Sequence, residues 1–255
     1  MMAVDTTLAE YDGVACETLR VRCGATGLVI RDHCASTMDL AHELAAAGAP
    51  HGTVVVAESQ AAGRGRTGKT WTSTRGAGVW VSVLLRDPLA APTGVLSLRV
   101  GLGLARALDA YVATPVQLKW PNDLFLHGAK LGGILIEARW RGDVAEWIVV
   151  GVGVNVREDL TEPGVAALGG SASCATVLSD VVQAVLQAAS PRGELGDGEV
   201  DEFAVRDLAR GREIVEPLAG IVVGITSSGG LQVRTPRGEA VAVAGSLVFR
   251  TLPPE

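Results

Sequence analysis

The sequence predicts an α+β fold, in which a mixed β-sheet with helices is followed by a small β-barrel. Residues 94–112 and 173–186 each carry apolar side chains at helical spacing. Residues 115–154 contain short apolar runs separated by turn residues, which is typical of a meander of strands. Residues 211–255 alternate short apolar runs with glycine turns, as small β-barrels do.

The first half of the chain is expected to contain one helix and three strands. The expected strands are residues 26–31, 53–57 and 79–85. Ser36-Thr37 is a good helix start because a serine side chain accepts a hydrogen bond from a free backbone N–H group. Gly48 is expected to end that helix. The first dozen residues carry no clear signal, and we expect them to be frayed.

The second half of the chain is expected to begin with a long helix and to continue as strands. The helix covers residues 94–112, and the strands are residues 115–120, 124–126, 133–140 and 147–154. Ser173 is a plausible cap for a second long helix. Residues 190–198 have the composition of a linker, and a short helix is expected near residues 199–210.

These elements suggest a division into three parts. Residues 1–25 are expected to form an N-terminal extension, residues 26–205 the main domain, and residues 206–255 the small β-barrel. A chain of 255 residues is long enough for such a division.

Composition excludes several classes of protein. The hydrophobic fraction of 48% is ample for a packed core, and a net charge of −6 argues against a bulk nucleic-acid binder. We find neither a membrane span nor a signal-peptide pattern, so we expect a cytoplasmic protein. The cysteines Cys16, Cys23, Cys34 and Cys174 form no C-x-x-C pair. We therefore expect no disulfide framework and no metal held by protein ligands alone.

The most informative segment is Gly63-Arg64-Gly65-Arg66-Thr67-Gly68-Lys69-Thr70, because it matches two nucleotide-binding patterns. It fits both the phosphate-binding P-loop and the dinucleotide fingerprint. Both motifs require a helix directly after the loop, since the phosphate binds at the helix N-terminus. The next residues are rich in threonine and glycine and run into an apolar strand. Both interpretations are therefore rejected.

Two interpretations of this segment remain. It is either a flexible ligand-binding loop or a solvated basic hairpin. It carries Arg64, Arg66 and Lys69 and is closed by Trp71. Arginine side chains bind carboxylate or phosphate in a bidentate manner, which favours an anionic ligand. The three cations repel one another, so we expect the order of the loop to depend on a bound anion.

Three further motifs combine glycine with polar residues near strand ends. They are Lys119-Trp120-Pro121-Asn122-Asp123, Lys130-Leu131-Gly132-Gly133 and Gly151-Val152-Gly153-Val154-Asn155. Each motif alone has a structural explanation, such as a surface ion pair, a hairpin or a close glycine crossing. Residues 63–71 are called the basic loop from here on. Together with the basic loop, the three motifs indicate one site at the ends of the strands of one sheet.

The four motifs, in this order and at this spacing, resemble the signature of biotin protein ligases. The resemblance covers roughly residues 30–250. It implies a catalytic domain like that of class II aminoacyl-tRNA synthetases, followed by an SH3-like barrel. It also implies a two-step reaction. The carboxylate of biotin attacks the α-phosphate of Mg-ATP to give biotinyl-5′-AMP, and a lysine of a biotin carboxyl carrier domain then displaces AMP.

The resemblance implies roles for individual residues. The catalytic residues are Lys130, Arg66 and Asp123. Biotin is expected to contact Ser36, Thr37, Met38, Gln60, Arg64, Gly65, Arg66, Lys130 and Gly133. ATP is expected to contact Arg64, Arg66, Trp71, Lys119, Asn122, Lys130 and Asn155. Trp71 is a candidate platform for adenine, and Asp123 is a candidate for orienting or deprotonating the incoming lysine.

Two residues depart from the family pattern. Met38 stands where the family often has asparagine, and Lys69 stands where arginine is usual. Both departures affect expected affinity rather than the assignment.

The resemblance also implies partners and leaves alternatives open. Only about 25–30 residues precede the matching segment, too few for a winged helix, so we expect a monofunctional ligase that binds no operator DNA. We expect no membrane partner, since no long uncharged apolar stretch is present. The oligomeric state, monomer or homodimer, stays open. The alternatives are a lipoate or octanoate ligase of the same superfamily and a non-catalytic biotin-sensing protein.

Overall fold

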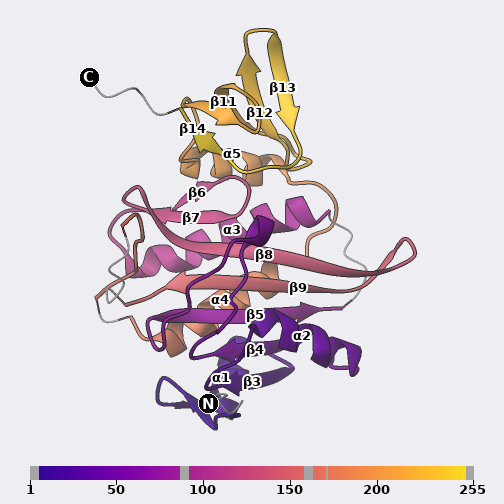
Figure 1. Ribbon diagram of the computed structural model, residues 1–255, viewed down its shortest axis with the longest axis vertical. Helices are drawn as coiled ribbons and strands as arrows, with labels where there is room; N and C mark the ends of the chain where they lie inside the picture. The colour runs from indigo at the N-terminus through magenta and orange to yellow at the C-terminus, as the bar shows by residue number, and fades with distance from the viewer. Residues whose placement is uncertain (1–5, 87–91, 158–162, 171, 251–255) are drawn as a thin grey trace.

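Seven strands form the main sheet of this computed structural model, which describes residues 6–86, 92–157, 163–170 and 172–250. In spatial order the strands are β3 (Gly27–Arg31), β4 (Thr53–Ala57), β5 (Gly78–Leu85), β9 (Val144–Asn155), β8 (Ala129–Arg141), β7 (Asp123–Leu126) and β6 (Gln117–Lys119) (Figure 1). The pair β3 and β4 is parallel, and every other neighbouring pair is antiparallel. The predicted α+β class with a mixed sheet is confirmed.

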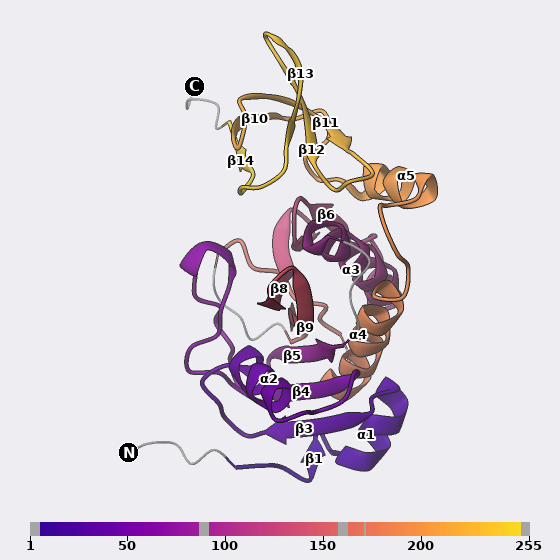
Figure 2. The same cartoon turned by 90° about the vertical axis from the view of Figure 1, so that its right-hand side faces the viewer.

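Helices cover both faces of this sheet. They are α1 (Cys16–Cys23), α3 (Thr93–Leu108) and α4 (Cys174–Ala188) on one face, and α2 (Thr37–Ala46) on the other (Figure 2). The predicted caps are confirmed, since Ser36 accepts a hydrogen bond from the Met38 N–H group and Ser173 accepts one from the Thr176 N–H group. A 3₁₀ turn at Asp109–Tyr111 completes the helix expected over residues 94–112.

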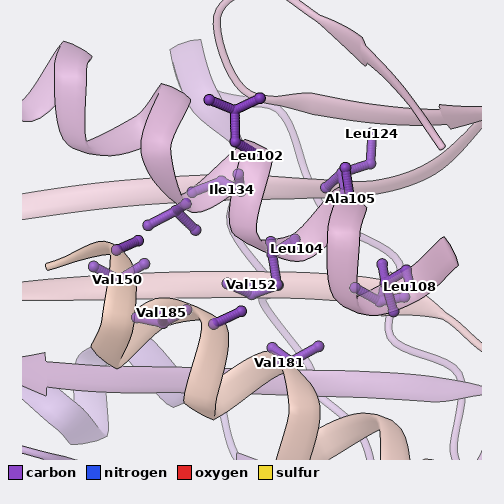
Figure 3. Packing of buried hydrophobic residues seen from close by; sticks show 14 of the residues in the cluster. Leu102, Leu104, Ala105, Leu108, Leu124, Ile134, Val150, Val152, Val181 and Val185 are labelled. Carbon is purple, nitrogen blue, oxygen red and sulfur yellow. The ribbon is translucent and has the colours of Figure 1, made fainter. Parts of the chain in front are cut away.

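The larger part of the core lies between the sheet and α3 and α4. Leu104 and Leu108 of α3 and Val181 of α4 are buried near Val150 and Val152 of the sheet (Figure 3). A smaller cluster under α2 comprises Met38, Ala41, Ala45, Val55, Leu84 and Val149. Because both faces are buried, strands β4 and β5 are buried along their whole length and are mostly apolar rather than alternating.

The N-terminal segment differs from expectation. From residue 6 to residue 12 the chain is not frayed: the Leu8 N–H group donates to the Ile30 carbonyl at 2.9 Å, and the buried Tyr11 hydroxyl donates to the Gly78 carbonyl at 3.1 Å. Residues 1–5 lie outside the described residues. The short strands β1 (Glu10–Tyr11) and β2 (Val14–Ala15) then lead into α1. Helix α1 was not predicted, because only Leu19 and Cys23 in it are buried and its apolar periodicity is therefore weak.

A second sheet forms the C-terminal part of the chain. Its five antiparallel strands lie in the order β13 (Gly238–Ala242), β12 (Leu231–Thr235), β11 (Gly220–Ile225), β10 (Glu213–Glu216) and β14 (Val248–Phe249). It contacts the main sheet through the Trp120 indole, whose N–H group donates to the Gly229 carbonyl at 3.0 Å. Among the described residues, no helix has the length and apolar character needed to cross a membrane.

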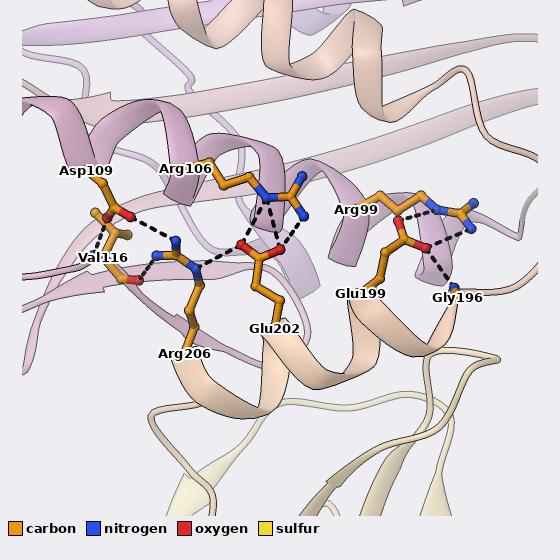
Figure 4. A network of polar contacts seen from close by, with 8 residues as sticks. All are labelled: Arg99, Arg106, Asp109, Val116, Gly196, Glu199, Glu202 and Arg206. Carbon is orange, nitrogen blue, oxygen red and sulfur yellow. Dashed lines mark hydrogen bonds and ion pairs between the residues drawn. The ribbon is translucent and has the colours of Figure 1, made fainter.

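Helix α5 (Asp197–Arg206) precedes the second sheet and is attached to α3 by ion pairs (Figure 4). The Arg99 guanidinium is buried and lies 2.9 Å from the Glu199 carboxylate. Arg206 lies 2.8 Å from Asp109 at the other end of α3. A buried arginine needs such partners, because an unpaired buried charge is strongly destabilising.

The segment after α5 contains a buried carboxyl group, Asp207. Its Oδ1 atom accepts a hydrogen bond from the Ala209 N–H group at 2.8 Å. Its Oδ2 atom is buried and has no hydrogen-bond partner among the described residues. Burial raises the pKa of Asp207 to about 6, from an ordinary value of 3.8. The folded protein therefore holds a proton there over a pH range in which the unfolded chain has already lost it.

Replacing Asp207 by asparagine should flatten the pH dependence of stability. Between about pH 4 and pH 6 the contribution of Asp207 to the stability of the wild-type protein falls as pH rises, because this side chain ionises freely only in the unfolded state there. The shift in the pKa of Asp207 from 3.8 to about 6 corresponds to about 3 kcal/mol in the free energy of unfolding. Asp207→Asn should gain that amount relative to wild type between pH 4 and pH 7, measured by urea unfolding. Parallel curves of unfolding free energy against pH for the two proteins would contradict the raised pKa of Asp207.

Candidate functional site

A cavity of about 300 Å³ opens on the α2 face of the main sheet. Residues from the start of α2, the basic loop, the β6–β7 turn, β8 and β9 line it. The predicted site residues found there are Ser36, Thr37, Met38, Gln60, Arg64, Gly65, Arg66, Trp71, Asn122, Asp123, Lys130, Gly133 and Asn155. Four motifs that are far apart in the sequence therefore meet in one place.

The basic loop is a hairpin. The Gly65 N–H group donates to the Lys69 carbonyl at 2.7 Å, and the Trp71 N–H group donates to the Gly63 carbonyl at 2.8 Å. Its tip is a single 3₁₀ turn at Arg66–Gly68, and no α-helix lies between it and β5. The strands on either side of it, β4 and β5, are antiparallel. The rejection of the P-loop and dinucleotide interpretations is confirmed.

One end of the cavity is lined by uncharged polar groups. The Gln60 side-chain oxygen accepts hydrogen bonds from the Thr37 backbone N–H group at 2.8 Å and from the Thr37 hydroxyl at 3.2 Å. The Gln60 amide nitrogen donates to the Ser73 hydroxyl at 2.8 Å, which fixes the orientation of the amide. The Thr37 hydroxyl also lies 2.9 Å from that of Ser82. These groups suit a neutral ligand that both donates and accepts hydrogen bonds.

Glycines on the sheet make room for large side chains at the site. A Cβ atom at residue 153 would lie 2.6 Å from the Trp71 ring, and one at residue 133 would lie 3.3 Å from it. A Cβ atom at residue 151 would lie 2.8 Å from the Met38 sulfur. Trp71 therefore packs flat against backbone, and the buried Met38 fills the adjacent space.

The opposite end of the cavity is positively charged. The Lys130 ammonium lies 2.6 Å from the Asp123 carboxylate and 5.3 Å from the centre of the Trp71 ring. The Arg66 guanidinium donates to the Asn122 side-chain oxygen at 3.3 Å. Burial lowers the pKa of Arg66, and the Asp123 carboxylate acts in the opposite direction. Because the two cations Arg66 and Lys130 are accompanied by one carboxylate, Asp123, which pairs with Lys130, this end of the cavity suits an additional anion.

The Trp71 indole has an unused donor. Its Nε1 atom is buried, and no partner for it is found in the part of the chain that the structure describes. Buried N–H groups are normally hydrogen-bonded, so this one is available to an acceptor atom of a ligand. The edge of the Trp80 ring supports the indole, with ring centres 6.3 Å apart.

The two asparagines hold the cavity wall together. The Asn122 amide donates to the Ile134 carbonyl at 2.7 Å, and the Asn155 amide donates to the Ala166 carbonyl at 3.0 Å. Both side chains therefore connect strands or loops in addition to lining the cavity.

Lys119 is the one predicted site residue that lies apart from the cavity lining. Its ammonium lies 5.8 Å from the centre of the Phe125 ring and 5.6 Å from that of Phe249 in the second sheet. Burial lowers its pKa.

The sequence did not indicate three residues that belong to the site. Ser73 and Ser82 complete the hydrogen bonds around Thr37 and Gln60, and Ser246 of the C-terminal part lines the cavity. Single serines outside a motif carry no signal in one sequence. Over the described ranges, no cluster of three or more histidine, cysteine, aspartate or glutamate side chains is arranged to hold a metal.

Gly153→Ala should displace Trp71, because the new methyl group would occupy space that the indole fills. We expect a loss of stability of about 1–3 kcal/mol and a changed near-ultraviolet circular dichroism spectrum. Gly94→Ala is the matched control, since nothing lies within 4 Å of its added atom. An unchanged spectrum for Gly153→Ala would show that Trp71 does not rest on this glycine.

Comparison with known proteins supports the same grouping of residues. Residues 32–155 match the Biotin/lipoate A/B protein ligase family. The chain is 38% identical over 132 residues to the bifunctional ligase/repressor BirA of Bacillus spizizenii, a match that covers 51% of this chain and 41% of that protein. It is 31% identical over 217 residues to a biotin–[acetyl-CoA-carboxylase] ligase of Paracoccus denitrificans, which covers 76% of this chain and 89% of that protein.

A solved structure shares the fold. The biotin protein ligase of Aquifex aeolicus in complex with biotin and ATP superposes with a TM-score of 0.74 and 26% identity. The superposition covers 88% of this chain and 99% of that one. The chain spans less than half the length of the Bacillus relative, but nearly all of the Paracoccus protein. With the motifs, the fold and these matches in agreement, the chain belongs to the biotin protein ligases of the Biotin/lipoate A/B protein ligase family.

Proposed function

We propose that the protein catalyses the ATP-dependent ligation of biotin to a lysine of a biotin carboxyl carrier protein, through biotinyl-5′-AMP. The observation that carries this proposal is the polarity of the cavity. Uncharged polar groups at Thr37 and Gln60 occupy one end, and the cations Arg66 and Lys130 occupy the other. Biotin has the same asymmetry, with a neutral ureido ring and an anionic carboxylate.

The first step needs two anions to be held together. An oxygen of the biotin carboxylate forms a bond to the α-phosphorus of ATP, and the bond between that phosphorus and the bridging oxygen of pyrophosphate breaks. Magnesium enters with ATP as part of the substrate. Arg66 and Lys130 offset the repulsion between the carboxylate and the phosphate, and they stabilise the charge that develops on the phosphoryl oxygens. Arg64, Asn122 and Asn155 lie at the edge of the same space.

The second step releases AMP. The amine of the carrier lysine attacks the carbonyl carbon of the mixed anhydride, loses a proton, and displaces the phosphate oxygen of AMP. Asp123 is well placed to receive or orient that proton, because it lines the cavity beside Lys130. A phosphate that attracts Lys130 would weaken the 2.6 Å ion pair and release the Asp123 carboxylate for this task.

The indole of Trp71 is proposed as the platform for adenine. Its flat packing on residues 133 and 153 fixes the plane of the ring, and stacking of a base on an aromatic side chain is typically worth about 1–3 kcal/mol. Lys119 is proposed to contribute to the field around the phosphates rather than to contact biotin.

We also propose a division into two domains and a protein partner. Residues 26–205 form the catalytic domain, related to class II aminoacyl-tRNA synthetases, and residues 206–255 form an SH3-like barrel. The five antiparallel strands β10–β14 support the second of these. The partner is the carrier domain of a biotin-dependent carboxylase, in line with the acetyl-CoA-carboxylase ligase name of the Paracoccus relative.

Lys130→Ala should lower adenylation by roughly 100-fold while the fold stays intact, because it removes a cation from the developing phosphoryl charge. The measurement is ATP–pyrophosphate exchange dependent on biotin. Arg237→Ala, which changes an exposed cation in the β12–β13 turn, is the control and should match wild type. Normal ATP–pyrophosphate exchange by Lys130→Ala would show that Lys130 does not stabilise the phosphoryl charge during adenylation. Exchange supported by lipoate in place of biotin would favour the lipoate-type alternative.

A further inference from the structure

The basic loop carries an arginine that is paired with two carboxylates of the protein itself. The NH2 atom of Arg64 lies 2.7 Å from the Asp39 carboxylate in α2 and 3.3 Å from the Glu137 carboxylate in β8. Glu137 and Arg64 also line a shallow groove on the outer side of the loop. Arg64 therefore connects the loop to a helix and to a strand, and the two acids are not part of the cavity lining itself.

A chain of hydrogen bonds fixes Glu137. The Trp147 indole N–H group lies 2.9 Å from the His42 Nδ1 atom, and indole nitrogen can only donate. Nδ1 must therefore accept, so the proton of the neutral imidazole is on Nε2. That Nε2 atom lies 3.1 Å from the Glu137 carboxylate and donates to it. Trp147 thus sets the tautomer of His42, and His42 sets the position of the carboxylate.

The ion pairs of Arg64 reduce the repulsion between the positive charges of the basic loop. Arg64, Arg66 and Lys69 lie within six residues of one another and repel in the absence of an anion. Asp39 and Glu137 supply two negative charges beside Arg64. Arg66 is held differently, by the neutral Asn122 side chain, and faces the cavity.

We propose that Asp39 and Glu137 are positioning residues that act as built-in counter-ions. They hold the basic loop over the cavity before any anionic ligand binds, with His42 and Trp147 keeping Glu137 in place. Arg64 is then the anchor of the loop, and Arg66 is the cation left for the ligand. The identity of that ligand rests on the proposed function, but the anchoring of the loop does not.

Limited trypsin digestion of the ligand-free protein tests the anchor, because trypsin cleaves after Arg64, Arg66 and Lys69. The double variant Asp39→Asn/Glu137→Gln keeps the shape of both side chains and removes their charges. We expect cleavage within the loop to be about fivefold to tenfold faster than in wild type. Cleavage elsewhere in the chain should keep its wild-type rate. Equal loop cleavage in the two proteins, or an equal acceleration at all sites, would overturn the proposal.

Two further variants sharpen this test. Glu146→Gln removes an acid that pairs with Arg141 further along the β8–β9 hairpin, and it should leave loop cleavage unchanged. Trp147→Phe removes the donor to His42 while keeping a large aromatic ring, and it should accelerate loop cleavage by about twofold to threefold. A wild-type rate for Trp147→Phe would overturn the part assigned to His42 and Trp147.

A binding measurement then connects the anchor to the ligand. If biotin binds only when the loop is closed, the apparent Kd for biotin should rise by the factor by which the closed fraction of the loop falls. Isothermal titration of wild type and the double variant with biotin measures that factor. A double variant whose loop is cleaved as fast as an unstructured segment, and is therefore mostly open, but whose Kd is unchanged would show that the anchor does not serve the site. Failure of wild type to bind biotin would instead contradict the proposed function, and the protease result would stand.

Discussion

The site depends on an area of the main sheet where the strands carry no side chains. Gly133, Gly151 and Gly153 point toward the α2 face, and both Trp71 and Met38 approach the backbone there more closely than a Cβ atom would allow. Elsewhere that face is filled by the cluster under α2. The glycines therefore determine where the sheet leaves space for a cavity, and the Trp71 ring fills part of that space. Lys130 and Asp123 lie at the rim of this area.

The positive charges of the site are balanced by carboxylates in two places, one in the cavity lining and one outside it. At the centre, Lys130 is paired with Asp123, and in the proposed reaction an incoming phosphate competes for Lys130. At the outer edge, Arg64 is paired with Asp39 and Glu137, which no ligand has to displace. The inner pair suits chemistry, because its members must change partners, whereas the outer pairs suit the maintenance of loop geometry.

Much of this arrangement was predictable from the sequence, and the reasons for the exceptions are physical. The caps at Ser36 and Ser173 and the apolar strands gave strong local signals, and the motifs identified more than half of the residues that line the cavity. Helix α1 was missed because it buries only Leu19 and Cys23, so its sequence shows little periodicity. The role of His42 was also invisible, since it depends on Trp147, 105 residues away in the chain. The pairing of Arg64 with Asp39 and Glu137 was invisible as well, because the two acids belong to distant elements.

In the proposed reaction, this cavity activates biotin and passes it to a carrier lysine. The most direct measurement is the mass of an apo biotin carrier domain after incubation with the protein, biotin, ATP and Mg²⁺. We expect the carrier to gain the mass of one biotinyl group, and only when ATP is present. An unchanged carrier mass, with the protein folded and both substrates in excess, would contradict it.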